Sequence, residues 1–273
     1  MNENIQREAL SKVPEVTLIF WIIKIAATTL GETGGDTVTM TLNLGYLAGS
    51  ALSLAALVIL VIAQVRAKSF QPILYWATIV ASTTFGTTMA DFADRSLGIG
   101  YTGGSLVLAL CLIATLALWR SAEGTIAVNT VSTPKVEAFY WAAITFSQTL
   151  GTALGDWIAD TGGIGYEGGT GGIGYEGGAL VFGAVLAVIA ALYFLTDVSR
   201  VALFWAGFIL TRPLGATVGD FLDKPVSDGG LALSRPLASL VLGVFIMICV
   251  VVLPQRAGRH PRVVREEAAS GAR

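Results

Sequence analysis

Apolar stretches of roughly 20 residues alternate with short polar segments along most of the chain, and about 20 mostly apolar residues suffice for a helix to cross the hydrocarbon core of a bilayer. The stretches are continuously apolar and too long for the alternating strands of a β-barrel. The pattern therefore predicts eight transmembrane helices. They cover about 15–34, 44–65, 71–90, 101–120, 136–155, 178–196, 198–217 and 235–254.

Polar and small residues recur inside these stretches at fixed spacings. Four segments begin with an aromatic residue and a tryptophan, reach a glycine ten residues after the tryptophan, and reach an aspartate five residues after that glycine. The tryptophans are Trp21, Trp76, Trp141 and Trp205, the glycines Gly31, Gly86, Gly151 and Gly215, and the aspartates Asp36, Asp91, Asp156 and Asp220. Four matches at two spacings indicate tandem copies of one two-helix unit. The predicted fold is an all-α membrane protein of eight transmembrane helices, arranged as four tandem helical hairpins over about 15–66, 70–120, 135–196 and 198–255.

This organisation resembles a bacterial family of uncharacterised membrane proteins built from four tandem two-helix repeats with a signature tryptophan, a repeat of unknown function. The resemblance covers residues 15–255 and implies the architecture, but it implies no activity. Residues 1–14 are mixed and polar, and residues 256–273 are basic and then rich in small residues. We expect both to be cytoplasmic, and the tail to be solvated and irregular.

The basic residues are distributed unequally between the predicted loops. Twelve of the 17 lie on one predicted side: Arg7, Lys12, Arg66, Lys68, Arg120, Lys135, Arg200, Arg256, Arg259, Arg262, Arg265 and Arg273. The positive-inside rule then predicts a multi-pass protein of the cell inner membrane with both termini in the cytoplasm. Aspartates gather toward the opposite, outer side. In the third outer loop TGGIGYEGG at 161–169 recurs at 170–178, which we interpret as a tolerated local duplication.

The composition excludes several classes of protein. Charged residues make up 13% of the chain, about half the usual share of a soluble domain, and hydrophobic residues 54%. A net charge of −2 predicts no basic face for nucleic acid. The one histidine is His260 in the tail, and Cys111 and Cys249 lie in apolar runs. No Ser/His, Cys/His or HExxH arrangement is present, so we expect no enzyme activity and no catalytic residues.

Glycine-rich loops at 98–103 and 163–168 match the letters of the dinucleotide-binding fingerprint, G-x-G-x-x-G. That fingerprint requires a preceding strand and a βαβ unit, whereas these loops connect membrane spans. We therefore predict no nucleotide cofactor.

The repeated tryptophans and glycines have ordinary structural explanations. Each tryptophan opens a span on the cytoplasmic side, where an indole anchors the helix at the interface or packs between helices. Each glycine lies deep in a span, where a small residue lets two helices approach closely. Alternatively, the glycine ends the helix early and leaves carbonyl groups facing a cavity, as in transporters with broken helices. Close packing is the favoured interpretation.

The repeated aspartates point more directly to a function, because an ionised carboxylate in the membrane is costly. They either cap helices at the outer interface or converge around the bundle axis. Each repeat also has an acidic partner at helical spacing: the pairs are Glu32/Asp36, Asp91/Asp94, Asp156/Asp160 and Asp220/Asp223. Glu32 is unique to the first repeat, where the other repeats have Thr87, Thr152 and Ala216.

Carboxylates without histidine or cysteine form an all-oxygen ligand set, which suits hard cations such as Mg²⁺, Ca²⁺ or Mn²⁺. The candidate metal ligands are Glu32, Asp36, Asp91, Asp156 and Asp220. Two cations, Lys24 and Arg212, break the repeat pattern within the spans. We interpret them as counter-charges or as coupling residues, and Pro213 after Arg212 predicts a kink.

A small-ion transporter is the function that these features favour, with a divalent cation such as manganese as its transported ion. Its partners are then the lipid bilayer and the ion, and no oligomeric state is predicted. Two alternatives stay open: a non-transporting structural or sensory membrane protein, and a transporter of a small anion that binds Arg212. We also expect the four Trp-Gly-Asp helices to line the centre and the more uniformly apolar helices to lie outside.

Overall fold

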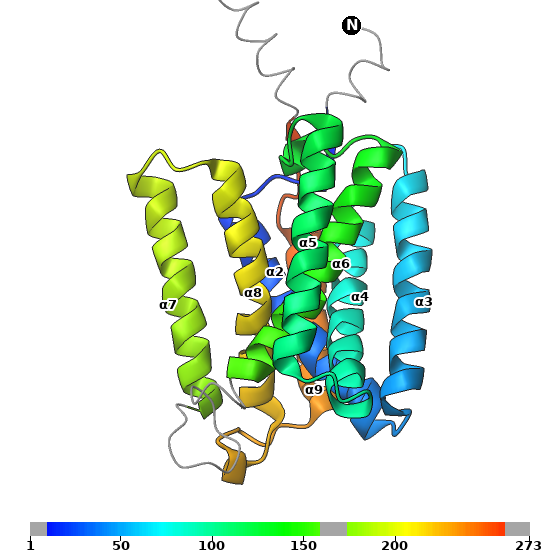
Figure 1. Cartoon of the computed structure of the whole chain (residues 1–273), viewed down its shortest axis with the longest axis vertical. Helices are drawn as coiled ribbons and strands as arrows, with labels where there is room; N and C mark the ends of the chain where they lie inside the picture. Colours follow the sequence, from blue (N-terminus) through cyan, green and yellow to red (C-terminus); the bar gives the residue numbers. More distant parts are fainter. Residues whose placement is uncertain (1–9, 159–173, 260–273) are drawn as a thin grey trace, which may run out of the picture.

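The computed structural model describes residues 10–158 and 174–259, and Figure 1 shows that long helices running side by side make up most of it. The described residues form eight such helices, which agree with the predicted stretches to within a few residues at nearly every end. They are α2 (Leu18–Asp36), α3 (Gly45–Arg66), α4 (Pro72–Asp91), α5 (Tyr101–Glu123), α6 (Pro134–Asp156), α7 (Gly174–Leu195), α8 (Arg200–Asp223) and α9 (Arg235–Val252). Most of the duplicated loop segment falls outside the described residues.

Local sequence signals explain where several helices begin. The side chains of Thr17, Thr133 and Ser199 precede α2, α6 and α8 and accept hydrogen bonds from backbone N–H groups in the first turn. These are N-caps, which satisfy donors that have no partner inside the helix. Pro72 and Pro134 occupy first-turn positions of α4 and α6, where a missing N–H costs nothing.

The four Trp-Gly-Asp helices form the centre of the molecule, as predicted. We call α2, α4, α6 and α8 the inner helices; α2 packs on α4, α4 on α6, α6 on α8, and α8 on α2, so that they close a ring. The helices α3, α5, α7 and α9, here called the outer helices, lie around this ring (Figure 1).

Each outer helix packs mainly against the inner helix of the following repeat, not against its own. Thus α3 covers α4, α5 covers α6, α7 covers α8, and the last outer helix, α9, returns to cover α2 of the first repeat. The four hairpins therefore interlock, and the first and last repeats complete each other.

The polarity of the bundle is the reverse of that of a soluble protein. The inner helices bury threonine, serine and charged side chains, whereas the outer helices expose leucine, isoleucine and valine. Among the described residues, five helices are long and apolar enough to cross a membrane: α3, α5, α7, α8 and α9. Apolar outer faces suit lipid, and the more polar α2, α4 and α6 lie behind them.

Two short strands join the ends of the chain at one end of the bundle. Strand β1 (Leu10–Pro14) pairs antiparallel with β2 (Ala257–Arg259). The expectation of an irregular tail was therefore wrong for residues 257–259, because their backbone bonds to β1. The Ser11 hydroxyl donates to the carbonyl of Val128 at 2.9 Å, which ties β1 to the short 3₁₀ helix η3 (Val128–Thr130).

A buried ion pair fixes β1 against the helices. The Lys12 ammonium lies 2.6 Å from a carboxylate oxygen of Glu137 in the first turn of α6, and it donates to the carbonyl of Val65 near the end of α3 at 3.1 Å. The Glu137 side chain is only 1% exposed. One lysine thus connects the N-terminal strand to two helices from different repeats.

An aromatic layer fills the inner ring at this same end. The residues that precede the four tryptophans are buried: Phe20, Tyr75, Tyr140 and Phe204. The hydroxyls of Tyr75 and Tyr140 lie 2.6 Å apart. Trp76, Trp141 and Trp205 are also buried, so that they pack between helices rather than standing free at an interface.

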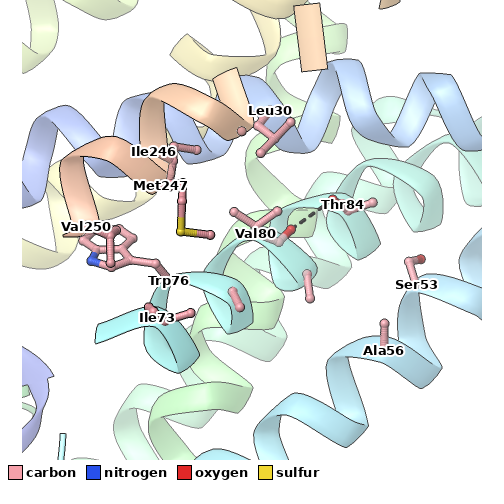
Figure 2. A pocket seen from close by; sticks show the side chains of 13 residues that line it. Leu30, Ser53, Ala56, Ile73, Trp76, Val80, Thr84, Ile246, Met247 and Val250 are labelled. Atoms are coloured by element: carbon pink, nitrogen blue, oxygen red, sulfur yellow. Dashed lines mark hydrogen bonds between the residues drawn. The ribbon is translucent and has the colours of Figure 1, made fainter. Parts of the chain in front are cut away.

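A mostly apolar cavity of about 390 Å³ lies on the flank of the bundle, between α3, α4 and α9 (Figure 2). Its wall includes Leu30, Val80, Ile246 and Met247, and no carboxylate lines it. Because its lining is apolar, this cavity offers no ligands for an ion, and the charged residues must be sought inside the ring.

Candidate functional site

Each repeated glycine receives a side chain from the next inner helix. An added Cβ at Gly31 would lie 2.3 Å from Thr83 Oγ1, and one at Gly215 would lie 2.3 Å from Thr28 Oγ1. An added Cβ at Gly151 would lie 2.4 Å from Arg212 Cγ, and one at Gly86 would lie 2.9 Å from the backbone carbonyl carbon of Gln148 and 3.1 Å from its Cβ. The inner helices continue past all four glycines, which supports close packing and not early helix breaks.

The contacting side chains all stand seven residues after the repeat tryptophan, so the packing places equivalent positions at equal heights in the ring. Four buried levels follow one another along the inner helices, at three, seven, eleven and fifteen residues after the tryptophan. They contain Lys24, Ile79, Ile144 and Phe208, then Thr28, Thr83, Gln148 and Arg212, then Glu32, Thr87, Thr152 and Ala216, and finally the four aspartates. Charge is concentrated at the fourth level, away from the aromatic layer.

Arg212, at the second level, connects the repeats by reaching two residues of the third level. Its guanidinium Nη2 donates to Glu32 Oε2 at 2.9 Å and to Thr87 Oγ1 at 2.5 Å. Arg212 is 0% exposed and Glu32 is 4% exposed. A buried charge without a partner is strongly unfavourable, so Glu32 and Arg212 neutralise each other here. Pro213 follows inside α8, which continues as one helix to Asp223.

Three of the five predicted ligands come together. One carboxylate oxygen from each of Glu32, Asp36 and Asp220 lies within 4.8 Å of the other two, and all three residues are buried. We call these three residues the carboxylate cluster. They belong to α2 and α8, which are neighbours only because the last repeat closes the ring on the first.

The other two predicted ligands lie beside this cluster. Asp91 forms an ion pair with Arg95, four residues later, in which Arg95 Nε lies 3.0 Å from Asp91 Oδ1. Asp156 is buried and interacts electrostatically with Glu32, Asp91 and Asp220. The structure therefore places all five carboxylates at one end of the inner ring but brings only three within the reach of one ion.

Basic side chains approach the cluster from the segment between α8 and α9. Lys224 Nζ lies 3.3 Å from Asp220 and 3.8 Å from Asp36, and Arg235 lies 3.6 Å from Asp36 and 3.1 Å from Asp223. The Asp220 carboxylate raises the pKa of Lys224, which follows the end of α8. The Oδ2 atom of Asp36 accepts no hydrogen bond among the described residues.

The sequence interpretation did not include Asp223, Lys224 and Arg235 in the site. A signal was present, because Asp220 and Asp223 are spaced to share one face of a helix, and Lys224 and Arg235 are exceptions to the bias of basic residues toward the other side. That Arg235 reaches Asp36 depends on α9 returning to α2, which the sequence does not show.

The repeated aspartates do not act as caps in α2 and α4. A single π-helical turn follows each of them directly: η1 (Thr37–Thr41) after Asp36 and η2 (Phe92–Ser96) after Asp91. Neither aspartate side chain makes a capping hydrogen bond. Single π turns occur often at functional sites.

The fold and the site together define a class: a four-repeat helical protein with an apolar exterior and a charged interior, suited to a membrane. The chain belongs to the family described as Repeat of Unknown Function (DUF347), whose repeat matches residues 19–70, 74–125, 139–199 and 203–255. These four matches confirm the suspected four-repeat family. No curated protein and no solved structure matches the chain.

Proposed function

We propose that the protein is a transporter of a small cation, with a divalent ion such as Mn²⁺ as its substrate. The observation that carries this proposal is the convergence of Glu32, Asp36 and Asp220. Metal–oxygen distances for hard divalent ions run from roughly 2.0 to 2.6 Å, so two ligands on opposite sides of one ion lie up to about 5 Å apart. The mutual separations of at most 4.8 Å fall within this range.

The charge balance around the cluster supports a cation rather than an anion. Seven carboxylates share this end of the inner ring: Glu32, Asp36, Asp91, Asp94, Asp156, Asp220 and Asp223. Their basic partners among the described residues are Arg95, Arg212, Lys224 and Arg235. The excess of carboxyl groups over basic groups favours a positive ion as the ligand.

The positions of Lys224 and Arg235 suggest how the carboxylate cluster exchanges a basic side chain for a cation. Lys224 Nζ lies 3.3 Å from Asp220 and 3.8 Å from Asp36, and Arg235 lies 3.6 Å from Asp36, distances longer than those of a close ion pair. An arriving divalent cation displaces the Lys224 ammonium, whose long, flexible stem lets it withdraw. Arg212 stays beneath the site and holds Glu32 in place.

The membrane arrangement that accompanies this function has eight spans. The inner α2, α4 and α6 cross the bilayer behind the apolar outer helices, because polar side chains in a membrane are tolerated only when they are sheltered from lipid. We propose an inner-membrane location with both termini cytoplasmic, on the basis of the basic-residue bias. The carboxylate cluster then faces the outer side.

The experiment is Mn²⁺ binding and flux with the purified chain reconstituted in liposomes. Asp36→Asn keeps the side-chain shape and removes one ligand charge, so we expect Mn²⁺ affinity and flux to fall at least tenfold while the melting temperature changes little. Asp197→Asn is the matched control, because Asp197 is exposed in the loop before α8, at the opposite end of the bundle. Wild-type flux in Asp36→Asn would show that Asp36 is not a ligand of the transported ion, and no flux in the wild type would favour a structural or sensory protein.

A further inference from the structure

A second group of polar side chains lies deeper in the inner ring, between the carboxylate cluster and the aromatic layer. Five nitrogen or oxygen atoms of four residues there are buried and have no hydrogen-bond partner among the described residues: Lys24 Nζ, Ser147 Oγ, Gln148 Nε2, Gln148 Oε1 and Arg212 Nε. Each of the four residues is 0% exposed. Buried polar atoms of this kind are rare, and each needs a partner, such as water or an ion.

The equivalent residues of the other repeats show that this region is unusual. Thr28 and Thr83, at the level of Gln148, donate to carbonyls of their own helices, and so do Ser82 and Thr211, at the level of Ser147. Ser147 and Gln148 make no such bond. The unpartnered atoms therefore mark one place in the ring rather than a general property of the repeat.

The four residues stand at neighbouring heights on three inner helices. Lys24 on α2 stands three residues after its repeat tryptophan, and Ser147 on α6 stands six residues after its own. Gln148 on α6 and Arg212 on α8 each stand seven residues after theirs. At a rise of 1.5 Å per residue, a span of four residues covers about 6 Å. Each of α2 and α6 packs directly on α8.

The chemistry of the group selects an anion. Four of the five atoms are donors or a hydroxyl group that can donate, and they include nitrogens of Lys24 and Arg212; Gln148 Oε1 is the one acceptor. Lys24 Nζ lies 4.1 Å from the centre of the Phe208 ring, and the charged group that acts on it is Arg212, which is also positive. The one nearby acid, Glu32, already accepts from Arg212 and Thr87. The Lys24 side chain therefore has no acidic partner among the described residues.

The space in the ring limits the size of the ligand. An added Cβ at Gly151 would lie 2.4 Å from Arg212 Cγ, so α6 and α8 are in close contact at the height of this group. We propose that Lys24, Ser147, Gln148 and Arg212 bind one monatomic anion, a halide, inside the inner ring. This site lies next to the carboxylate cluster and is connected to it through Arg212, which also holds Glu32, but it does not depend on transport of a cation.

Bromide binding tests the proposal directly. The full-length purified protein is titrated with sodium bromide against sodium gluconate at constant ionic strength, and the melting temperature is followed, since a ligand of the folded state at concentration c stabilises it by RT ln(1 + c/Kd). We expect bromide to stabilise the wild type along this curve, and at least a tenfold loss of bromide affinity in Lys24→Met and in Gln148→Leu. Lys24→Arg keeps a cationic donor and should retain binding better than Lys24→Met.

The control is Thr84→Val, because Thr84 lines the outer cavity and not the inner ring. This variant should bind bromide as the wild type does. Mn²⁺ binding should be unchanged in Gln148→Leu, and bromide binding should survive Asp36→Asn, which separates this site from the carboxylate cluster. Equal melting temperatures of the wild type in bromide and in gluconate overturn the proposal. So does wild-type bromide affinity in both Lys24→Met and Gln148→Leu.

Discussion

At the scale of single residues, the contacts at the repeated glycines set how close the inner helices lie. Gly151 faces Arg212, the residue that holds Glu32, so the glycine and the charged site are mechanically connected. A methyl group at this position has no room, because Arg212 Cβ and Cγ lie 2.5 and 2.4 Å from it. Packing at the glycines therefore controls the geometry of the carboxylate cluster.

We expect Gly151→Ala to destabilise the protein by about 1–3 kcal/mol, the usual cost of overpacking a core. The same substitution should displace Arg212 and weaken Mn²⁺ binding. Gly183→Ala in α7 is the control, since an added Cβ there meets nothing within 4 Å and alanine favours helix. Equal melting temperatures for the two variants would show that the glycine contacts are not tight.

Lys224 provides a second test at this scale. Its ammonium lies near both Asp36 and Asp220, so it competes with a divalent cation for the same oxygens. We expect Lys224→Met to increase Mn²⁺ affinity several-fold, measured by titration calorimetry. Because the metal replaces the lost charge, Mn²⁺ should also raise the melting temperature of this variant more than that of the wild type. A decrease in affinity would mean that Lys224 helps to build the site.

At the scale of elements, strand β1 fastens the N-terminal segment across one end of the bundle. Lys12 on this strand pairs with Glu137 on α6, and both side chains are almost fully buried. Removing one partner leaves an uncompensated buried charge, which typically costs about 3–5 kcal/mol. We expect Glu137→Gln to lower the melting temperature clearly and to expose β1 to proteolysis.

The double variant Lys12→Met/Glu137→Gln removes both charges and should recover part of the lost stability. The comparison is a double-mutant cycle, in which a large coupling energy reports a direct interaction. If the two single losses simply add, the pair does not fasten the strand.

Element positions were largely predictable, and the reason lies in the length of the signals. Each helix carries about 20 apolar residues bounded by polar turns, so all eight were located from the sequence. Strand β2 was missed because its three residues, Ala257–Arg259, carry no apolar pattern. It is held by backbone pairing with a segment more than 240 residues away.

At the scale of the whole molecule, the interlocking of the repeats was not predictable. The apolar face of an outer helix fits any inner helix of the same template, so the sequence does not show whether α3 covers α2 or α4. The structure shows that it covers α4, and that α9 covers α2. The order of the ring then determines which carboxylates meet.

This order explains the outcome at the candidate site. Glu32 occurs only in the first repeat, and its ring neighbours are α4 and α8. Both Asp91 on α4 and Asp220 on α8 pair with a basic residue four positions later, but it is Asp220 that comes within 4.8 Å of Glu32 and Asp36. The sequence gives the five candidate carboxylates, but selecting three of them requires the closed ring.

A disulfide cross-link tests the closure of the ring. Thr33 Oγ1 on α2 and Ser239 Oγ on α9 lie 2.9 Å apart, so Thr33→Cys/Ser239→Cys places two thiols in contact. In a background with Cys111→Ala and Cys249→Ala, we expect oxidation to link the first and last repeats within one chain. Protease cleavage in the loop before α8 should then leave the two fragments joined until a reductant is added.

Ser53→Cys/Thr88→Cys is the companion pair, because Ser53 Oγ on α3 and Thr88 Oγ1 on α4 lie 2.9 Å apart. Both pairs should cross-link efficiently. Cross-linking of neither pair, or only between separate chains, would refute the interlocked ring.

The most direct measurement of the central claim is a structure of the full chain in lipid with Mn²⁺, in which anomalous scattering locates the metal. The account predicts one strong peak between the carboxylates of Glu32, Asp36 and Asp220, at roughly 2.0–2.6 Å from an oxygen of each, with Lys224 moved away. A fully occupied metal elsewhere, or these three carboxylates unchanged and still paired with Lys224 and Arg235 at saturating Mn²⁺, would contradict it.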